Sequence, residues 1–387
     1  MNGWPEIPAR HLYVHVPFCT RRCSYCDFAI AVRRVVPVAD YLDGVHRELR
    51  QRLREAPVAP LDTVYLGGGT PSRLGGDGVA RLLARIAEQV TIAADAEVTI
   101  EANPEDVTPS DVARWRAAGI NRVSLGVQSF DPAVLQWMHR SHTVEQVEGA
   151  VAMVRDGGIA QLSLDLIFAL PAVLDRRWEH DLDRALVLAP DHLSIYGLTV
   201  EPATPLGKWT ARGASVPADE ERYAAEFLAA DARCRAAGYA HYEVSNYARA
   251  AHAGDRSRRA RHNGAYWRHV PYLAVGPGAH GFDGTSRWWN HGAYAHWLAE
   301  VRAGRLPLEG RETPDADARR AEAVYLGLRT SDGLTLDPAE SSLVAEWVTA
   351  GWGALHADGR LVLTPEGWLR LDALAAALTS LPSRCEL

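Results

Sequence analysis

Short apolar runs rich in β-branched residues recur along the first half of the chain, and an amphipathic stretch follows each of them. Such runs are typical of buried strands, whereas apolar residues spaced three and four apart are typical of helices. The predicted strands are Leu12–Val16, Thr63–Leu66, Glu97–Glu101, Arg122–Val127, Gln161–Phe168 and His192–Thr199. The predicted helices are Tyr41–Arg52, Gly78–Gln89, Ser110–Ala118, Val144–Asp156, Arg177–Leu188 and Asp219–Ala237. This alternation predicts an α/β protein with a parallel sheet and helices outside it.

Two architectures fit the repeat. Right-handed crossovers can curl the strands into an open partial barrel, or the same strands can form a flat, doubly wound sheet. The polar residues favour the barrel because they come where strands end, as in Gly67–Ser72 and at Glu101. In a barrel, such strand ends meet on one rim. We therefore predict a partial (β/α)6 barrel over residues 1–237.

The pattern changes after residue 237. Residues 238–312 contain a further strand, Tyr242–Ala248, and a loop with a histidine and several arginines, and we expect them to extend the barrel. The pattern of apolar residues over residues 313–387 predicts two helices, Ala316–Leu328 and Glu340–Ala350, and then a β-hairpin near Gly359. This order resembles a winged-helix-like α+β domain. The domain is not basic, so packing or partner docking is expected there and nucleic-acid binding is not.

Composition narrows the function classes. Hydrophobic residues make up 47% and charged residues 23% of the 387 residues, as in ordinary globular proteins. A net charge of −7 argues against a surface made for polyanions. No apolar run reaches the ~18 residues needed to span a bilayer. Peripheral membrane contact and a homodimer both stay open at this stage.

Three of the five cysteines lie close together as Cys19, Cys23 and Cys26, at the spacing C-x3-C-x2-C. The sequence begins without a secretory leader, so we expect a reducing cytoplasm and metal binding, not disulfides. Three thiolates are one short of a closed zinc or iron–sulfur site. On a [4Fe–4S] cluster they would leave one iron open to a small molecule. A zinc site completed by Asp27 or His15, or three unrelated buried cysteines, is the alternative.

The cysteine spacing resembles the signature of radical S-adenosylmethionine (SAM) enzymes, in which the open iron chelates SAM. The whole chain resembles the HemN and HemW group of that superfamily. The matching stretches are Leu12–Cys19, Gly67–Pro71, Glu101–Pro104, Gly126–Ser129 and Asp165–Ile167.

Three details favour the haem-chaperone branch, HemW, over coproporphyrinogen III oxidase, HemN. HemN continues the loop with a fourth cysteine where this chain has Phe28, and only 18 residues precede Cys19, whereas HemN carries a longer arm. His262-Asn263-x-x-Tyr266-Trp267 also matches the H-N-x-x-Y-W motif associated with haem binding in HemW.

The resemblance implies a role for each matching residue. Cys19, Cys23 and Cys26 would hold the cluster, and Tyr13 and Tyr25 would lie against SAM. Gly68, Gly69 and Thr70 would meet the methionine part of SAM, and Glu101 would bind its ribose. In HemN, residues matching Gln128, Arg140 and Asp165 contact a second SAM. His262, Asn263, Tyr266 and Trp267 would contact haem, with arginines such as Arg258 or Arg261 near its propionates.

These sequence features are compatible with three functions. The leading one is a haem chaperone with a radical SAM core, which carries haem as cargo to apo-haemoprotein acceptors. The second is oxygen-independent coproporphyrinogen III oxidase, which decarboxylates propionates by radical chemistry. The third is a non-catalytic metal or electron-transfer protein. No catalytic residue is predicted, and whether the chain is an enzyme stays open.

Overall fold

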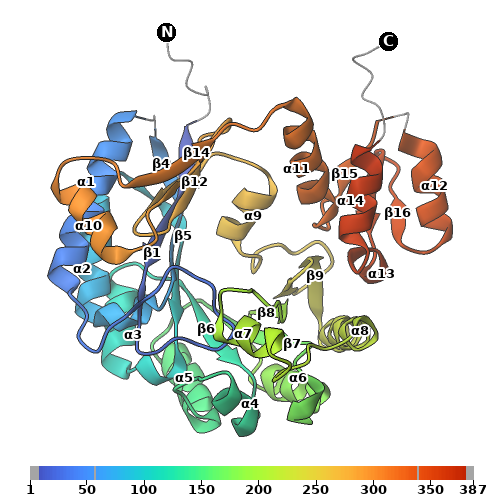
Figure 1. Ribbon diagram of the computed structural model, residues 1–387, viewed down its shortest axis with the longest axis horizontal. Coiled ribbons are helices and arrows are strands. Elements are labelled where there is room, and N and C mark those ends of the chain that lie inside the picture. Colours follow the sequence, from blue (N-terminus) through green and yellow to red (C-terminus); the bar gives the residue numbers. More distant parts are fainter. Residues whose placement is uncertain (1–7, 56–57, 338–339, 381–387) are drawn as a thin grey trace.

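A curved nine-stranded sheet forms the centre of the computed structural model, which describes residues 8–55, 58–337 and 340–380 (Figure 1). The strand order is β11-β1-β4-β5-β6-β7-β8-β10-β9. All neighbours from β11 to β8 are parallel, and β10 and β9 add an antiparallel edge. The bounds are β1 Ala9–Val16, β4 Val58–Gly68, β5 Ile92–Ala102, β6 Arg122–Gln128, β7 Gln161–Phe168, β8 His192–Gly197, β9 Tyr239–Glu243, β10 Asn246–Arg249 and β11 Leu273–Val275.

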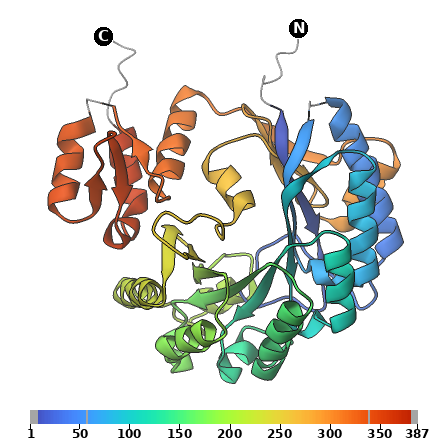
Figure 2. The ribbon, with the colours of Figure 1, turned by 180° about the vertical axis from the view of Figure 1, so that it is seen from behind.

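Helices cover the outer face of this sheet (Figures 1 and 2). They are α1 Val38–Glu55, α2 Gly75–Ala87, α3 Pro109–Ala117, α4 Pro132–Trp137, α5 Val144–Asp156, α6 Trp178–Val187 and α8 Glu220–Ala236. The strands and helices predicted over residues 1–237 and the partial parallel barrel are thus confirmed. The single strand predicted at Tyr242–Ala248 was wrong, because β9 and β10 form a hairpin there. The sequence did not predict α4, nor α7, Pro205–Ala211, which lies at the rim.

β1 illustrates how the sequence builds two layers. Leu12, Val14 and Val16 are fully buried in the main apolar core. The alternate residues His11, Tyr13 and His15 belong to polar and aromatic contacts, because successive strand residues point to opposite faces of a sheet. The barrel therefore has an apolar layer on one face of the sheet and a polar lining on the other.

The two edges of the sheet do not join. β11 pairs with β1, β9 forms the opposite edge, and the short helix α9, Arg261–Trp267, lies in the opening between them (Figure 1). β11 has only three residues, too few for a periodic signal, and the sequence did not predict it. The segment that carries the H-N-x-x-Y-W motif therefore fills the barrel opening.

Two small antiparallel sheets complete the fold. The first is β12 His280–Phe282, β13 Arg287–Asn290 and β14 Leu308–Glu312, with α10 Tyr294–Arg302 beside it. The second belongs to the C-terminal part, which comprises α11 Ala316–Leu328, β15 Leu334–Thr335, α12 Ser341–Thr349, β16 Gly353–Leu355, β17 Arg360–Leu363, α13 Pro365–Trp368 and α14 Leu371–Thr379. Helix, strand, helix and hairpin follow in the order expected for a winged-helix-like unit.

The C-terminal part packs against the β9 edge of the barrel. The Trp368 ring meets His241 edge-on at 4.3 Å, and the Trp368 indole donates a hydrogen bond to the Leu328 carbonyl at 3.0 Å. Arg329 forms an ion pair with buried Glu243 at 3.1 Å. The division at residues 237 and 312 stays a prediction, although both positions fall between elements. None of the helices in the described ranges combines the length and apolarity required to cross a bilayer.

Candidate functional site

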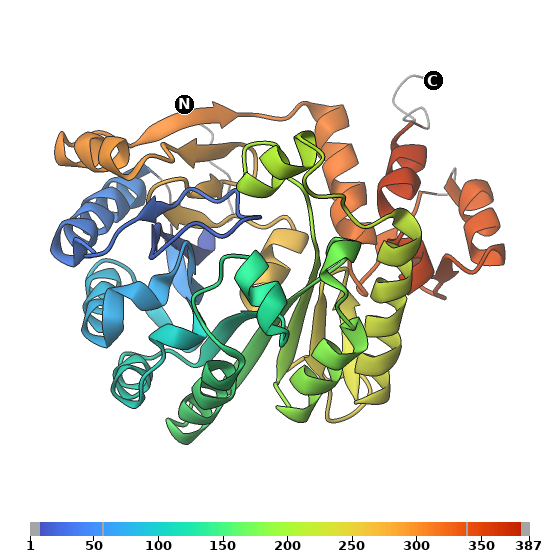
Figure 3. The ribbon, with the colours of Figure 1, turned by 60° about the horizontal axis from the view of Figure 1, so that its bottom comes forward.

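A cavity of about 510 Å³ opens at the carboxyl ends of the parallel strands. The cysteine loop forms part of its wall and crosses the end of the barrel in the dark blue segment of Figure 3. Eleven predicted residues line this one cavity: Cys19, Cys23, Cys26, Tyr25, Gly68, Gly69, Thr70, Glu101, Gln128, Arg140 and Asp165, with only Tyr13 of the expected SAM residues missing. Residues spread over five strand ends are thus brought together.

Backbone and side-chain contacts fix the cysteine loop over the cavity. Cys19 lies on β2, Phe18–Cys19, which pairs in parallel with β3, Ala31–Val32. The Ser24 N–H donates to the Met138 carbonyl at 3.1 Å, which ties the middle of the loop to the end of α4. Cys19 Sγ and Thr70 Oγ1 are 3.4 Å apart, and Arg140 Nη1 donates to Cys23 Sγ at 3.5 Å. Two of the three thiols therefore contact the rim directly.

The donor set fits a three-thiolate iron–sulfur cluster. Burial raises the pKa of the Cys19 thiol, and it raises that of Cys26 to about 11, so neither thiolate is favoured without a cation. Bound metal deprotonates coordinating thiols, and the three thiols share a wall of one cavity. A [4Fe–4S] cluster takes its thiolates on separate irons, so they need not converge on a single point.

Neither candidate fourth ligand of the zinc alternative is grouped with the cysteines around one point in the described ranges. The His15 ring is used elsewhere, with Nε2 2.8 Å from the Ala29 carbonyl and Nδ1 3.2 Å from the Tyr13 hydroxyl. Asp27 is exposed. Within the described ranges, no group of three or more His, Cys, Asp or Glu side chains is placed to hold one metal ion. The arrangement therefore suits a cluster better than a compact zinc site.

Close packing explains the glycine run at the end of β4. A Cβ on Gly69 would lie 2.6 Å from the Pro17 carbonyl oxygen, and one on Gly68 would lie 2.6 Å from the His15 ring. Gly68 also has a φ of 109°, which disfavours other residues. The run therefore lets the strand end lie directly against β1 while its backbone faces the cavity.

Two carboxylates lie at the bottom of the cavity. Glu101 accepts hydrogen bonds from the Tyr65 hydroxyl at 2.7 Å and the Gly68 N–H at 3.1 Å, and burial raises its pKa to about 7. Asp165 accepts from the Ser124 hydroxyl at 2.9 Å, and burial raises its pKa to about 6. Carboxylates that are costly to ionise favour a ligand that brings hydroxyl donors or positive charge. SAM offers both, through its ribose and its ammonium and sulfonium groups.

Arg140 joins the cysteine loop to the strand ends. Besides Cys23, it donates to Asn103 Oδ1 at 2.6 Å and to the Gly126 carbonyl at 2.8 Å. Gln128 ends β6 with a φ of 68°, an uncommon conformation for a residue other than glycine. That conformation turns the chain where Gln128 lines the cavity.

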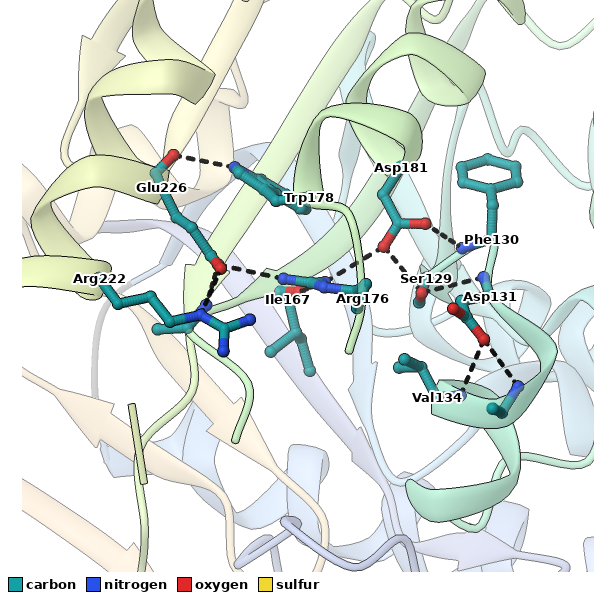
Figure 4. A network of polar contacts seen from close by, with 12 residues as sticks. Ser129, Phe130, Asp131, Val134, Ile167, Arg176, Trp178, Asp181, Arg222 and Glu226 are labelled. Atoms are coloured by element: carbon teal, nitrogen blue, oxygen red, sulfur yellow. Dashed lines mark hydrogen bonds and ion pairs between the residues drawn. The ribbon is translucent and has the colours of Figure 1, made fainter. Parts of the chain in front are cut away.

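A buried ionic network supports this turn from below (Figure 4). Asp181 accepts from the Ser129 hydroxyl and the Phe130 N–H, both at 2.7 Å. Arg176 links Asp181 to Glu226, at 3.1 Å from each. A buried charge is costly unless it is paired, and each charge in this network has a partner. The network thus holds the ends of β6 and β7, which carry Gln128 and Asp165.

Tyr13 lies one layer below the cavity, not on its wall. Its ring stacks on Tyr65 at a centroid distance of 6.0 Å. Tyr65, Asn103, Ser124 and Tyr196 line the cavity although they were not predicted. Tyr65 and Ser124 could have been found from the inward alternation of their strands, and Asn103 from its place in the matching stretch Glu101–Pro104.

The H-N-x-x-Y-W segment lies away from the cavity. His262 is 1% exposed, with Nδ1 2.6 Å from Thr63 Oγ1 and Nε2 2.8 Å from the Tyr266 hydroxyl. Its ring stacks on Tyr65 at 5.0 Å, directly below the cavity floor. Burial lowers its pKa to about 3, so the ring is neutral. Both ring nitrogens are therefore engaged here, and a haem contact by this segment stays a prediction.

The other three residues of this segment are less buried than His262. Asn263, Tyr266 and Trp267 are half-buried, and Trp267 lies under the Arg329 guanidinium at 3.9 Å. Of the two arginines suggested for propionates, Arg258 pairs with Asp191, whereas Arg261 is exposed and donates to the Asp95 carbonyl.

Comparison with known proteins agrees with this geometry. The Radical SAM superfamily profile matches residues 13–185. "Heme chaperone HemW" of Mycobacterium tuberculosis is 39% identical over 95% of this chain and 94% of its own length. HemW of Synechocystis is 35% identical over 87% of this chain and 81% of its own. The chain belongs to the HemW family of radical SAM proteins.

A mitochondrial relative and a solved structure are also similar to this HemW family member. A mitochondrial radical SAM domain-containing protein 1 of Bos taurus is 35% identical over all of this chain and 91% of its own length. The solved structure of coproporphyrinogen III oxidase (HemN) from Escherichia coli has a TM-score of 0.80 at 22% identity, covering 97% of this chain and 92% of that one. This likeness shows the fold. Membership of the radical SAM superfamily implies a [4Fe–4S] cluster and SAM as cofactors.

Proposed function

We propose that this protein is a haem chaperone, which binds haem as cargo and transfers it to apo-haemoproteins in the cytoplasm. The observation that carries the proposal is the likeness to proteins named haem chaperones along nearly the whole chain. The likeness to coproporphyrinogen III oxidase is one of fold, and Phe28 stands where that branch has a fourth cysteine. We therefore do not propose the oxidase activity.

The rim cavity would hold the two resident cofactors. Cys19, Cys23 and Cys26 would ligate the cluster, and the cluster would supply an open iron and a reducing electron for SAM. Glu101 would accept the ribose hydroxyls, and Gly68, Gly69 and Thr70 would border the methionine end. Gln128, Arg140 and Asp165 would contact the nucleoside side of the same cavity or a second SAM. These roles are supported by the shared cavity wall.

Haem would use another part of the chain, the α9 segment with Asn263, Tyr266 and Trp267. An iron bond through His262 would require its ring to exchange the bonds to Thr63 and Tyr266 for the metal, and hence α9 to move in the barrel opening. Exposed Arg261 would balance a propionate charge. The proposal thus places cargo and cofactors on opposite sides of the Tyr65 layer.

Haemin titration of the reconstituted protein tests the proposal. We expect a saturable Soret band and transfer of haem to an apo-haemoprotein such as apomyoglobin, followed by the spectrum of the acceptor. Asn263→Ala, at a half-buried position, should weaken saturable binding, whereas His252→Ala in the exposed basic loop should not. Weak, non-saturable uptake by all three proteins would refute a haem site, and stoichiometric formation of vinyl product from coproporphyrinogen III would favour the oxidase instead.

A further inference from the structure

Two histidine rings lie face to face at the start of helix α10. The rings of His291 and His296 are 3.7 Å apart between their centroids, and their planes are inclined by 17°. His296 is exposed and His291 is half-buried, and neither ring takes part in a hydrogen bond within the described ranges. Neither residue lines the rim cavity. The pair therefore has no role in the sites described above.

The fold holds both histidines firmly in place. The backbone N–H of His291 donates to the Pro307 carbonyl at 2.9 Å. His296 belongs to the first turn of α10, and its neighbour Trp297 is fully buried and donates to the buried Glu48 carboxylate at 2.8 Å. Side chains on such fixed elements lose little freedom when they bind a ligand. The two rings are thus arranged before any ligand arrives.

The separation of the rings suits two ligands of one metal ion. Imidazole nitrogen is a preferred ligand of zinc, nickel and copper ions. Two nitrogens bound tetrahedrally at ~2.0–2.1 Å from a zinc ion are ~3.4 Å apart. Rings stacked at 3.7 Å place nitrogens of a common edge at nearly this separation. A small rotation of the exposed His296 ring is enough to make two nitrogen lone pairs converge.

A carboxylate lies one helical turn beyond His296. Arg305 lowers the pKa of Glu300, and His296 and His291 lower it further, so this carboxylate is within electrostatic reach of both rings. Arg305 holds Glu300 by two bonds, at 2.7 and 2.8 Å, and offsets its charge. No group of three His, Cys, Asp or Glu side chains in the described part of the chain surrounds one point. The two imidazoles would therefore carry the binding.

We propose that His291 and His296 bind one divalent metal ion of the zinc and nickel class, with water in the other coordination positions. The site goes beyond the proposed function, because it uses neither the cluster cysteines nor α9. It lies where α10 runs along the outside of the molecule beside α1, so its open positions are accessible from solvent (Figure 1). The competing reading is an aromatic pair that only packs.

Calorimetric titration with Ni²⁺ tests the site in the untagged, reconstituted protein, whose cysteine loop is occupied by the cluster. We expect one saturable site in the wild type. His291→Asn and His296→Asn should each lower the Ni²⁺ affinity at least about tenfold, since even the partners of metal ligands contribute that much. The double variant should lose little more than either single variant, because one histidine alone forms no chelate. His180→Asn, at an exposed, single histidine of α6, should leave the affinity unchanged.

Three further measurements identify the kind of site. Acidification to about pH 5 should release Ni²⁺, because a metal-bound imidazole must be neutral. Mg²⁺ should not compete, since it prefers oxygen ligands. Arg305→Gln should strengthen Ni²⁺ binding about twofold to fivefold, because it removes a nearby positive charge and frees the Glu300 carboxylate.

Two results would overturn the proposal. One is the absence of saturable Ni²⁺ binding by the wild type, which would leave the rings as a packing pair. The other is an equal loss of affinity in His180→Asn and His296→Asn, which would mean that Ni²⁺ binds to surface histidines in general. Haemin uptake by His296→Asn should match that of the wild type, so a failure of the haem proposal would be seen separately.

Discussion

Replacing His262 by alanine should destabilise the fold, because its ring is part of the barrel interior. The ring is 1% exposed and contacts Tyr65 and Tyr266 at centroid distances of 5.0 and 5.1 Å. Removing a buried ring of this size costs ~2–3 kcal/mol through lost packing. The Tyr266 hydroxyl would lose its bond to Nε2, which adds ~1–2 kcal/mol, whereas Thr63 keeps His11 as a partner. We expect a total loss of ~3–5 kcal/mol in the free energy of unfolding.

Urea unfolding, followed by tryptophan fluorescence, measures this loss through the shift of the midpoint at constant slope. Tyr266→Phe removes only the hydroxyl and should cost ~1 kcal/mol, and it should cost less than that when His262 is already alanine. His252→Ala is the matched control, because His252 is exposed and its replacement should change stability by less than ~0.5 kcal/mol.

A loss of less than ~1 kcal/mol in the free energy of unfolding for His262→Ala would refute this reasoning. A loss that small is expected for a histidine on the surface, not for one with a buried ring. Such a result together with a lost Soret band would instead mean that α9 lies outside the barrel in solution. The two outcomes separate a structural histidine from an iron ligand.

Three further predictions concern the rim. SAM affinity should be up to about tenfold lower at about pH 6 than at about pH 8. The reason is that the buried Glu101 carboxyl has a pKa of about 7, and its protonated form accepts hydrogen bonds poorly. Calorimetric titration should show this pH dependence in the wild type and its absence in Glu101→Gln. Cys26→Ala should lower the iron content well below about four per chain after reconstitution, whereas Cys234→Ala, at a buried cysteine in α8, should not. Asp181→Asn should cost ~3 kcal/mol of stability because it removes a negative charge that pairs with the buried Arg176 guanidinium. Asp183→Asn, in an exposed ion pair on the same helix, should cost less than ~1 kcal/mol. The midpoints of urea unfolding distinguish the two variants.

The sequence could predict that these residues share one rim cavity because of a property of parallel sheets. Carboxyl ends of neighbouring strands meet at one edge, so Glu101 and Asp165 had to converge once their strands were recognised. The spacing of the cysteines is local, and a loop that short keeps its thiols together. The contacts of Arg140 with Cys23 and Asn103 could not be predicted in this way, because they depend on how the loop between α4 and α5 folds back over the strand ends.

The H-N-x-x-Y-W segment shows where sequence reasoning failed to give a location. A histidine followed by tyrosine and tryptophan has the same appearance on a surface loop and in a barrel opening. What places His262 inside is the pairing of its Nδ1 with Thr63, 199 positions earlier in the chain. No local pattern carries that information. The same holds for β11, whose three residues find β1 only through the tertiary fold.

The pairing of β11 with β1 affects how the chain folds during synthesis and where it can be truncated. Leu12 gains its outer neighbour, Leu273, only after more than two thirds of the protein has left the ribosome. Until then β1 is an unprotected sheet edge, available to any other extended segment. A shortened protein ending at residue 237 would hold every cluster and SAM residue named above and still expose that edge, so self-association, not loss of ligands, should limit its use.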